Sequence, residues 1–376
     1  MSGKVKYLCC IFNYAPHYRL PIFEKIDKEC KAHFYFGDRL LNNEHIEKLD
    51  YSKLDGYQAE LKVGSIKLGR HKLEYTKGWL GLAVSPRYKQ YLITPNQFAL
   101  NQWLFLLLCF ILRKEVYVWM HGLQTSQNPR RTLVVWRIYD LFLRGSFLYG
   151  NHAKRNMQKL GFDERKFHLI YNSLNYDTSK ALRQSALENP YESRFGDRAP
   201  ILIFIGRLTA VKKLHMLVQA VDLLKQRGVV VNVAFVGEGP EQSRLQQAIA
   251  DADRERFWFV GPLYDEREIA RYLYYADVCV SPGNVGLTGI HALSYGVPVI
   301  TNDNFEAQMP EFEAVEQGST GDFFKENDAC SLADRIESWL RRNVDREQVR
   351  NQCYEVIDTK YNPTYQVEVV KKVLGL

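Results

Sequence analysis

The chain of 376 residues is long enough for two domains, and its 46% hydrophobic and 25% charged residues exclude an intrinsically disordered protein. The formal net charge of +7 is uneven: residues 1–178 hold 27 Lys and Arg against 15 Asp and Glu, and the remainder holds 23 against 28. This asymmetry predicts a basic surface on the first half that faces an anionic membrane or a phosphate-bearing lipid, and not nucleic acid, because no nucleic-acid-binding signature accompanies it. The seven scattered cysteines exclude a disulfide framework and a zinc site, and indicate a reducing, cytoplasmic compartment.

The first half of the chain contains short apolar runs that predict the strands of an α/β domain over residues 1–178. These runs are Lys6–Phe12, Ala32–Phe36, Tyr91–Thr94, Glu115–Met120, Phe147–Gly150 and His168–Asn172.

Two other segments of the first half predict apolar helices. The stretch Trp103–Leu112 has about half the length that a bilayer-spanning helix requires, which favours a buried or monotopic helix. In Arg130–Gly145, arginines alternate with aromatic and aliphatic residues. Such a helix either rests on an anionic membrane leaflet or packs on the core with its arginines in water, and both interpretations stay open.

The second half alternates strands and helices regularly, which predicts a doubly wound parallel sheet over residues 200–355. The strands are Ile201–Gly206, Val229–Gly237, Phe257–Gly261, Val278–Gly283 and Val297–Thr301, and the helices are His215–Gly228, Glu241–Asp253, Glu268–Ala276 and Thr288–Tyr295. The polar segment 179–199 is predicted to be the interdomain linker. Residues 356–376 are predicted to form a C-terminal helix that packs back on the first domain.

Two cations follow the first strand of the second half. In an open parallel sheet, ligands bind beyond the carboxyl ends of the strands, where the strand order reverses. Arg207 and Lys212 lie there, directly after Gly206, and can neutralise a diphosphate and stabilise it as a leaving group. The alternative is a solvated basic loop.

Glycine-containing loops follow the next two strands. In the first of them, Gly239 and Pro240 allow close backbone approach, and Glu238 can accept hydrogen bonds from a nucleobase or a ribose. Gly261 and Leu263 are expected to form part of a nucleobase pocket. Such loops also occur as plain turns.

The loop that begins the segment Ser281–Ile300 is the most informative, because it is rich in glycine and lies between a strand and a short helix. This arrangement directs free backbone N–H groups and the positive end of a helix dipole at one point. The amides expected to bind a diphosphate belong to Val285, Gly286, Leu287 and Thr288. The alternative is a tight turn whose glycines serve helix packing.

The motifs GRL…KK, GEGPE, FVG and ADVCVSPG…GLTGIHALSYGVPVITND occur in this order, and with them the second half resembles the donor domain of glycosyltransferase family 4. The resemblance implies the α/β fold called GT-B, with two Rossmann-like, doubly wound parallel-sheet domains facing a cleft. It also implies retaining, metal-independent transfer from a UDP- or GDP-linked sugar, with no cofactor. Arg207 and Lys212 then hold the donor diphosphate, assisted by the amides of Gly286–Thr288.

The sequence departs from the family at two positions. The family usually has two glutamates eight positions apart, of which the first contacts the donor sugar and the second the ribose. Gly283 and His291 occupy these positions here. His291 can still hydrogen-bond a ribose through a ring nitrogen, and Asn284 is the candidate substitute for the missing first glutamate.

The first half resembles the acceptor domain of the same family less specifically. Its acceptor-side loop supplies the candidate acceptor-binding residues Tyr14, Pro16, His17 and Arg19. His121 follows a strand at the place where family members have a residue close to the donor sugar. It is the third candidate catalytic residue, with Arg207 and Lys212, and otherwise a structural histidine.

The predicted function is transfer of a hexose-type sugar to a saccharide or lipid-linked saccharide, in bacterial surface polysaccharide synthesis. The basic first domain is expected to contact the inner face of the plasma membrane. Two alternatives stay open: a GT-B nucleotide-sugar epimerase, and a non-catalytic GT-B partner subunit.

Overall fold

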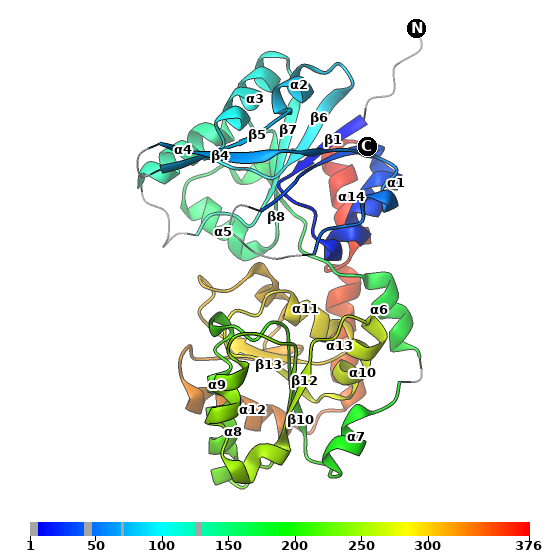
Figure 1. Ribbon diagram of the computed structural model, residues 1–376, viewed down its shortest axis with the longest axis vertical. Helices are drawn as coiled ribbons and strands as arrows, with labels where there is room; N and C mark the ends of the chain where they lie inside the picture. The colour runs from blue at the N-terminus through cyan, green and yellow to red at the C-terminus, as the bar shows by residue number, and fades with distance from the viewer. Residues whose placement is uncertain (1–6, 41–46, 69–70, 125–129, 186) are drawn as a thin grey trace. The chain divides into compact units, whose positions relative to one another are not determined.

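The computed structural model describes residues 7–40, 47–68, 71–124, 130–185 and 187–376. The chain divides into two units, the first made of Met1–Ser173 with Pro363–Leu376 and the second of Leu174–Asn362. Each unit contains a parallel sheet covered by helices on both faces (Figure 1). Such an arrangement buries the strands on both sides, as their continuous apolar runs require.

The sheet of the first unit has seven strands in the order β3-β2-β1-β6-β7-β8-β9, and all neighbours are parallel. The strands are β1 (Tyr7–Phe12), β2 (Ala32–Gly37), β3 (Tyr57–Leu61), β6 (Tyr88–Ile93), β7 (Glu115–Met120), β8 (Gly145–Leu148) and β9 (Phe167–Leu169). The strand order reverses between β1 and β6, so a crevice is expected at their carboxyl ends.

Helices cover both faces of this sheet, and a two-stranded antiparallel hairpin of β4 and β5 accompanies it. The bounds are α1 (Leu20–Cys30), α2 (Trp79–Val84), α3 (Leu100–Ile111), α4 (Arg130–Asp140), α5 (Asn151–Lys159), α14 (Pro363–Leu374), β4 (Val63–Leu68) and β5 (His71–Thr76). Strand β1 explains the two layers, because Leu8 and Cys10 pack in a core with α1 and α14, while Cys9 and Ile11 pack in a second core with α3, α4 and α5.

Helix α14 belongs to the first unit although it ends the chain. Gln366 anchors it by accepting a hydrogen bond from Ser173 (2.6 Å) and donating one to the carbonyl of Tyr171 (2.9 Å). The return to the first unit therefore occurs at Pro363, later than the predicted 356.

The sheet of the second unit has six parallel strands in the order β12-β11-β10-β13-β14-β15. The strands are β10 (Ile201–Ile205), β11 (Asn232–Val236), β12 (Phe257–Gly261), β13 (Val278–Ser281), β14 (Val299–Asn302) and β15 (Gly321–Phe324). The helices are α6 (Tyr176–Arg183), α7 (Pro190–Phe195), α8 (His215–Gln226), α9 (Gln242–Ala248), α10 (Glu266–Tyr275), α11 (Leu287–Ser294), α12 (Ala329–Leu340) and α13 (Arg346–Thr359). Here the strand order reverses between β10 and β13.

The segment 179–199, predicted to be the interdomain linker, lies within the second unit and contains the end of α6 and all of α7. Polar residues before and within this segment cap its helices. Asn175 accepts a hydrogen bond from the N–H of Thr178, and Asn189 caps α7, which begins with Pro190.

The predicted fold of two doubly wound parallel sheets is confirmed. The sequence patterns did not predict the strands β3, β4, β5 and β15 or the helices α1, α2, α5, α6, α7, α12 and α13. Among the described residues, no helix is both long and apolar enough to cross a membrane.

Candidate functional site

The carboxyl ends of β10, β11 and β12 come together through glycines. Gly237 has a φ of +132°, and a Cβ there would lie 2.1 Å from the carbonyl oxygen of Gly206. A Cβ on Gly239 would lie 2.3 Å from the oxygen of Leu208. The N–H of Gly237 donates to the carbonyl of Gly261 (2.8 Å). Only glycine permits this backbone packing, so the predicted close approach in these loops is a structural one.

The two cationic side chains predicted to hold a diphosphate, Lys212 and Arg207, differ in burial and in hydrogen bonding. The ammonium of Lys212 donates to the backbone oxygen of Asn284 (2.7 Å) and to its side-chain oxygen (2.9 Å). Burial lowers the pKa of Lys212, and the nearby carboxylate of Glu311 opposes that shift. The side chain of Arg207 is exposed, and its guanidinium has no hydrogen-bond or ion-pair partner in the described part of the chain. Lys212 is therefore fixed in place, whereas Arg207 is free to turn toward a ligand.

Lys212 lies beside the first turn of α11. Its Nζ would be 3.8 Å from a Cβ on Gly286, the residue that caps this helix with a φ of +53°. The hydroxyl of Thr288 donates to the carbonyl of Ile205 (2.8 Å), which joins α11 to the end of β10. The N–H groups of Gly286, Leu287 and Thr288 have no acceptor among the described residues. An ammonium and three open amides thus point to one anion site.

The expectation for Val285 is wrong. Its N–H donates to the side-chain oxygen of Gln308 (2.8 Å), and the residue is fully buried, so this amide is not available to a ligand. Gln308 lies 23 positions further along the chain, and the sequence carried no signal for this contact.

Gly283 occupies the position of the first family glutamate, and the backbone leaves no room for a side chain. A Cβ there would lie 2.0 Å from the oxygen of Val211, and the N–H of Gly283 donates to the carbonyl of Lys212 (2.9 Å). Asn284, the predicted substitute, holds Lys212 instead of pointing freely to a sugar.

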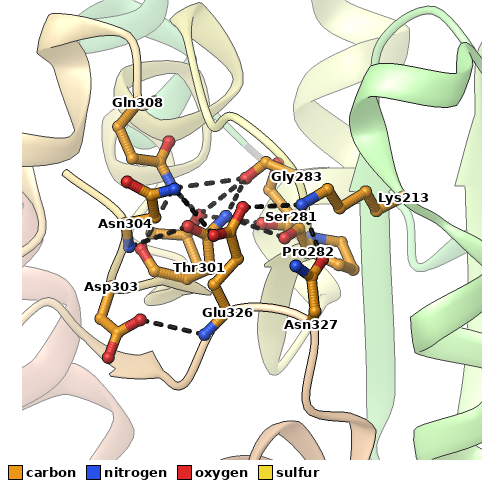
Figure 2. Close-up of polar contacts among 11 residues, drawn as sticks. Lys213, Ser281, Pro282, Gly283, Thr301, Asp303, Asn304, Gln308, Glu326 and Asn327 are labelled. Carbon is orange, nitrogen blue, oxygen red and sulfur yellow. Dashed lines mark hydrogen bonds and ion pairs between the residues drawn. The ribbon is translucent and has the colours of Figure 1, made fainter. Parts of the chain in front are cut away.

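A polar network fixes this loop at the ends of β13 and β14 (Figure 2). The carbonyl of Gly283 accepts hydrogen bonds from Asn302 (2.8 Å) and from Thr301 and Gln308 (3.3 Å each). Figure 2 also shows Lys213, whose ammonium pairs with Glu326 (2.7 Å). These hydrogen bonds come from the protein itself, so the conformation around Gly283 is set before any ligand binds.

His291 occupies the position of the second family glutamate and meets a carboxylate from another helix. Its Nε2 lies 2.9 Å from Oε1 of Glu266, and the hydroxyl of Tyr295 donates to the same oxygen (2.6 Å). Burial by itself raises the pKa of Glu266, but the hydrogen bonds from His291 and Tyr295 outweigh it and hold the pKa below its usual value. Sequence reasoning missed Glu266, whose one signal was its place shortly after the loop of Gly261 and Leu263.

The remaining residues predicted to bind the donor lie at the end of β12 and in the loops that follow β11 and β12. Glu238 and Pro240 are exposed, whereas Gly261 and Leu263 are partly buried. The carbonyl of Glu238 accepts a hydrogen bond from the N–H of Leu208 (2.9 Å), which leaves its carboxylate as the group that can reach a ligand.

In the first unit, two of the predicted residues share an aromatic cluster. His121 follows β7, and its ring stacks on Tyr149 at 4.6 Å. The guanidinium of Arg19 lies 4.5 Å from the ring centre of Trp119. One guanidinium nitrogen of Arg19 is buried without a hydrogen-bond partner among the described residues, so it can bind a ligand oxygen.

The other predicted acceptor residues have structural contacts. Pro16 is buried and pairs with Lys48 in an isolated bridge, and the N–H of His17 donates to the carbonyl of Glu47 (3.0 Å). Tyr14 is half-buried between them and β1.

A pocket of about 280 Å³ opens where the strand order of the first sheet reverses. Residues that follow β1, β2 and β6 line it, and its polar side chains are Asn13, Arg39, Glu74, Thr76, Thr94, Asn96 and Gln102. Trp79 also lines it, is 6% exposed, and has an indole N–H without an acceptor in the described part of the chain. An unmatched buried donor beside a polar pocket indicates a ligand that accepts hydrogen bonds. Sequence reasoning missed this pocket, although Asn13 directly follows one predicted strand and Thr94 ends another.

Among the described residues, no group of three His, Cys, Asp or Glu side chains could hold a metal ion.

Comparison with known proteins places the second unit in a family. The model described as glycosyl transferases group 1 matches residues 187–356. The chain is 24% identical to the putative colanic acid biosynthesis glycosyltransferase WcaL of Escherichia coli, over 62% of this chain and 57% of WcaL. It is 28% identical to the amylovoran biosynthesis glycosyltransferase AmsK of Erwinia amylovora, over 56% of this chain and 47% of AmsK. The chain thus spans about half the length of the curated relatives it matches.

The same fold occurs in solved structures. That of Anabaena HepE in complex with UDP superposes with a TM-score of 0.72 and 14% identity, over 98% of this chain and 100% of HepE. This likeness shows the fold alone, which is GT-B. The family model, its four motifs in order and the GT-B fold agree, and the second unit of the chain belongs to the glycosyl transferases group 1 family, glycosyltransferase family 4.

Proposed function

We propose that this protein transfers a hexose-type sugar from a nucleoside-diphosphate sugar to a saccharide or a lipid-linked saccharide. The observation that carries this proposal is the ammonium of Lys212 beside three open amides at the start of α11. A cation and a helix N-terminus at a strand-order reversal suit a diphosphate, and both strengthen their interaction as the diphosphate gains charge.

In the proposed reaction, the bond between the anomeric carbon and the diphosphate breaks through an oxocarbenium-like transition state. The acceptor hydroxyl oxygen forms the new bond on the same face, and its proton passes to the leaving diphosphate. Lys212 and the amides of Gly286–Thr288 stabilise the leaving group, and Arg207 adds charge when it turns toward the ligand. Retention of configuration is what membership of the family implies.

We further propose that Glu266 takes the place of the missing ribose-binding glutamate. His291 and Tyr295 both direct hydrogen bonds to one of its oxygens, which leaves the other oxygen for a ribose hydroxyl. The low pKa keeps the carboxylate ionised and therefore a strong acceptor. The loop that carries Glu238, and the end of β12 with Gly261 and Leu263, are proposed to contact the nucleobase.

For the acceptor, we propose the pocket of the first unit, together with Arg19, which directly precedes α1, and His121, which follows β7. Several hydroxyl-binding groups and the unmatched N–H of Trp79 suit a saccharide, which presents many oxygen acceptors. The solved complexes of HepE contain UDP or UDP-glucose, which makes a UDP-linked hexose the first donor to test. The relatives named for colanic acid and amylovoran biosynthesis support a role in bacterial surface polysaccharide synthesis.

One observation favours a second candidate, a non-catalytic subunit. The backbone at Gly283 excludes the side chain that contacts the donor sugar in the family. A protein that only keeps the fold has no need for an anion site, however, so donor binding separates the two.

The test is calorimetric titration with UDP, GDP and ADP and their glucose conjugates, with and without EDTA, followed by product analysis. We expect one nucleoside diphosphate to bind, unaffected by EDTA, and its sugar to be released on addition of acceptor. Absence of binding by all of them would refute the donor site. Binding with conversion of the sugar in the absence of acceptor would establish the epimerase.

A further inference from the structure

The first unit carries an apolar surface that its own core does not use. Twenty large hydrophobic side chains of the described residues are exposed, and ten of them lie on α3, α4 and the residues that directly follow these helices. On α3 and after it these are Leu100, Leu104, Leu107, Phe110, Ile111 and Leu112; on α4 and after it they are Val134, Val135, Ile138 and Leu141. We call these ten residues the α3–α4 surface.

Helical spacing makes this surface a continuous stripe on each helix. On α3, Leu100, Leu104, Leu107 and Ile111 follow one another at intervals of three or four, opposite a buried face centred on Phe105. The helix is therefore apolar on both sides. An α3 that served only the core would carry polar residues on its outer face.

The two helices lie side by side, so their stripes form one patch. Trp103 of α3 packs edge-on against Tyr139 of α4, with ring centres 5.1 Å apart. Phe110 packs in the same way against Phe142, at 5.8 Å. A contiguous apolar patch of this kind is rare on a protein that remains free in water.

Positive charge surrounds the patch, and negative charge is nearly absent. Arg113 follows α3, Arg130 and Arg131 begin α4, and Arg144 follows α4; all four are exposed. The one acidic residue on either helix, Asp140, is neutralised by Lys166 at 2.9 Å. An apolar face with a cationic rim complements the acyl chains and the anionic headgroups of a membrane leaflet.

The length of α3 decides the mode of contact. Twelve residues extend about 18 Å, against roughly 30 Å of hydrocarbon in a bilayer. Neither helix can span the membrane, so both would lie in the plane of the interface.

We propose that the α3–α4 surface docks this protein on an anionic lipid bilayer. The surface also reaches the pocket of the first unit, because Ala99 and Gln102, at the start of α3, line that pocket, and the adjacent Phe98 and Leu100 are each 57% exposed. If the pocket binds the acceptor, as proposed above, its saccharide enters from the membrane surface and its lipid stays in the leaflet. This last step rests on the proposed function, whereas docking itself does not.

The test is cosedimentation with vesicles of phosphatidylcholine alone or with about one third phosphatidylglycerol, without any substrate. We expect binding to the anionic vesicles that falls with rising salt and is weak on phosphatidylcholine. Ile111→Gln with Leu141→Gln should lower the bound fraction by about tenfold or more, because these side chains are 64% and 72% exposed and can change without unfolding the protein. Arg130→Gln with Arg131→Gln should lower it on anionic vesicles to a similar degree.

The matched control is Val230→Gln with Val344→Gln, which replaces exposed apolar residues of the second unit (44% and 36%) and should leave binding unchanged. Equal loss in this control, or wild-type protein that stays in the supernatant at low salt, would overturn the proposal. So would a stable dimer that Ile111→Gln with Leu141→Gln converts to a monomer, because the patch would then be a contact between two copies. Since no turnover is measured, failure of the transferase proposal would leave this result standing.

Discussion

Lys212→Ala removes the group on which the proposed chemistry depends most. The Nζ of Lys212 is held by both oxygens of Asn284 and lies 3.8 Å from the Cβ position of Gly286. An anionic oxygen bound by the amides of α11 would lie about 4 Å from this ammonium, given hydrogen bonds of ordinary length.

At that separation, a pair of unit charges interacts by about 4 kcal/mol with an effective dielectric constant of 20. Part of this attraction already exists in the bound donor, and the amides remain in the variant. We therefore expect kcat to fall by about 10²–10³, the loss typical of one preorganised charge-stabilising group. The affinity for the nucleoside diphosphate should fall as well, because the same ammonium binds the product.

The assay is release of the nucleoside diphosphate under saturating donor and acceptor. Thermal unfolding must accompany it, because the carbonyl of Asn284 loses a hydrogen bond worth about 1 kcal/mol. Lys225→Ala is the matched control: this lysine lies on α8, is 56% exposed on its side chain and pairs with Asp253 at the surface, so its loss should change neither rate nor stability appreciably. A Lys212→Ala protein that is folded and retains kcat within threefold of the wild type would refute the diphosphate assignment.

Three further predictions follow from the geometry. Gly283→Ala should lower the free energy of unfolding by about 2 kcal/mol or more in a denaturation experiment, because its Cβ would lie 2.0 Å from the oxygen of Val211. The control is Gly81→Ala in the same experiment, which should be neutral or stabilising because a Cβ at this position has open space around it. Glu266→Gln should raise KM for the donor about tenfold with little change in kcat. Because the pKa of the Glu266 carboxyl is held below its usual value, this difference in KM between wild type and variant should persist near neutral pH. It should vanish as the pH falls through that pKa, where residue 266 is uncharged in both proteins. A pH-independent effect would show that Glu266 serves packing alone. Trp79→Phe should raise KM for the acceptor by roughly tenfold and leave KM for the donor unchanged, and an unchanged acceptor KM would exclude the pocket of the first unit.

The sequence by itself determined the architecture of the second unit. Runs such as Ile201–Ile205 are apolar at every position, which requires a strand buried on both faces, and the helices between them follow from spacing. The order of the strand-end loops then located Lys212 and the amides of α11, because parallel strands bring their carboxyl ends to one edge. The first unit was harder, since β3 mixes exposed and buried residues. In the second unit, the polar caps of α7 resemble a linker.

Only the tertiary structure decided how these residues are used. The N–H of Val285, predicted to bind a diphosphate, donates instead to Gln308, a side chain from a distant loop. The space available for a side chain at Gly283 is limited by the backbone of Val211, which lies far away in sequence. Glu266 meets His291 because two helices pack together, 25 positions apart along the chain. The outward face of α3 shows the same limit, since the apolar stretch Trp103–Leu112 left both a buried and a monotopic helix open, and only the solvent exposure of its side chains reveals that one face of α3 is a surface. Local patterns specify which elements form, whereas contacts between elements specify which side chains remain free to act.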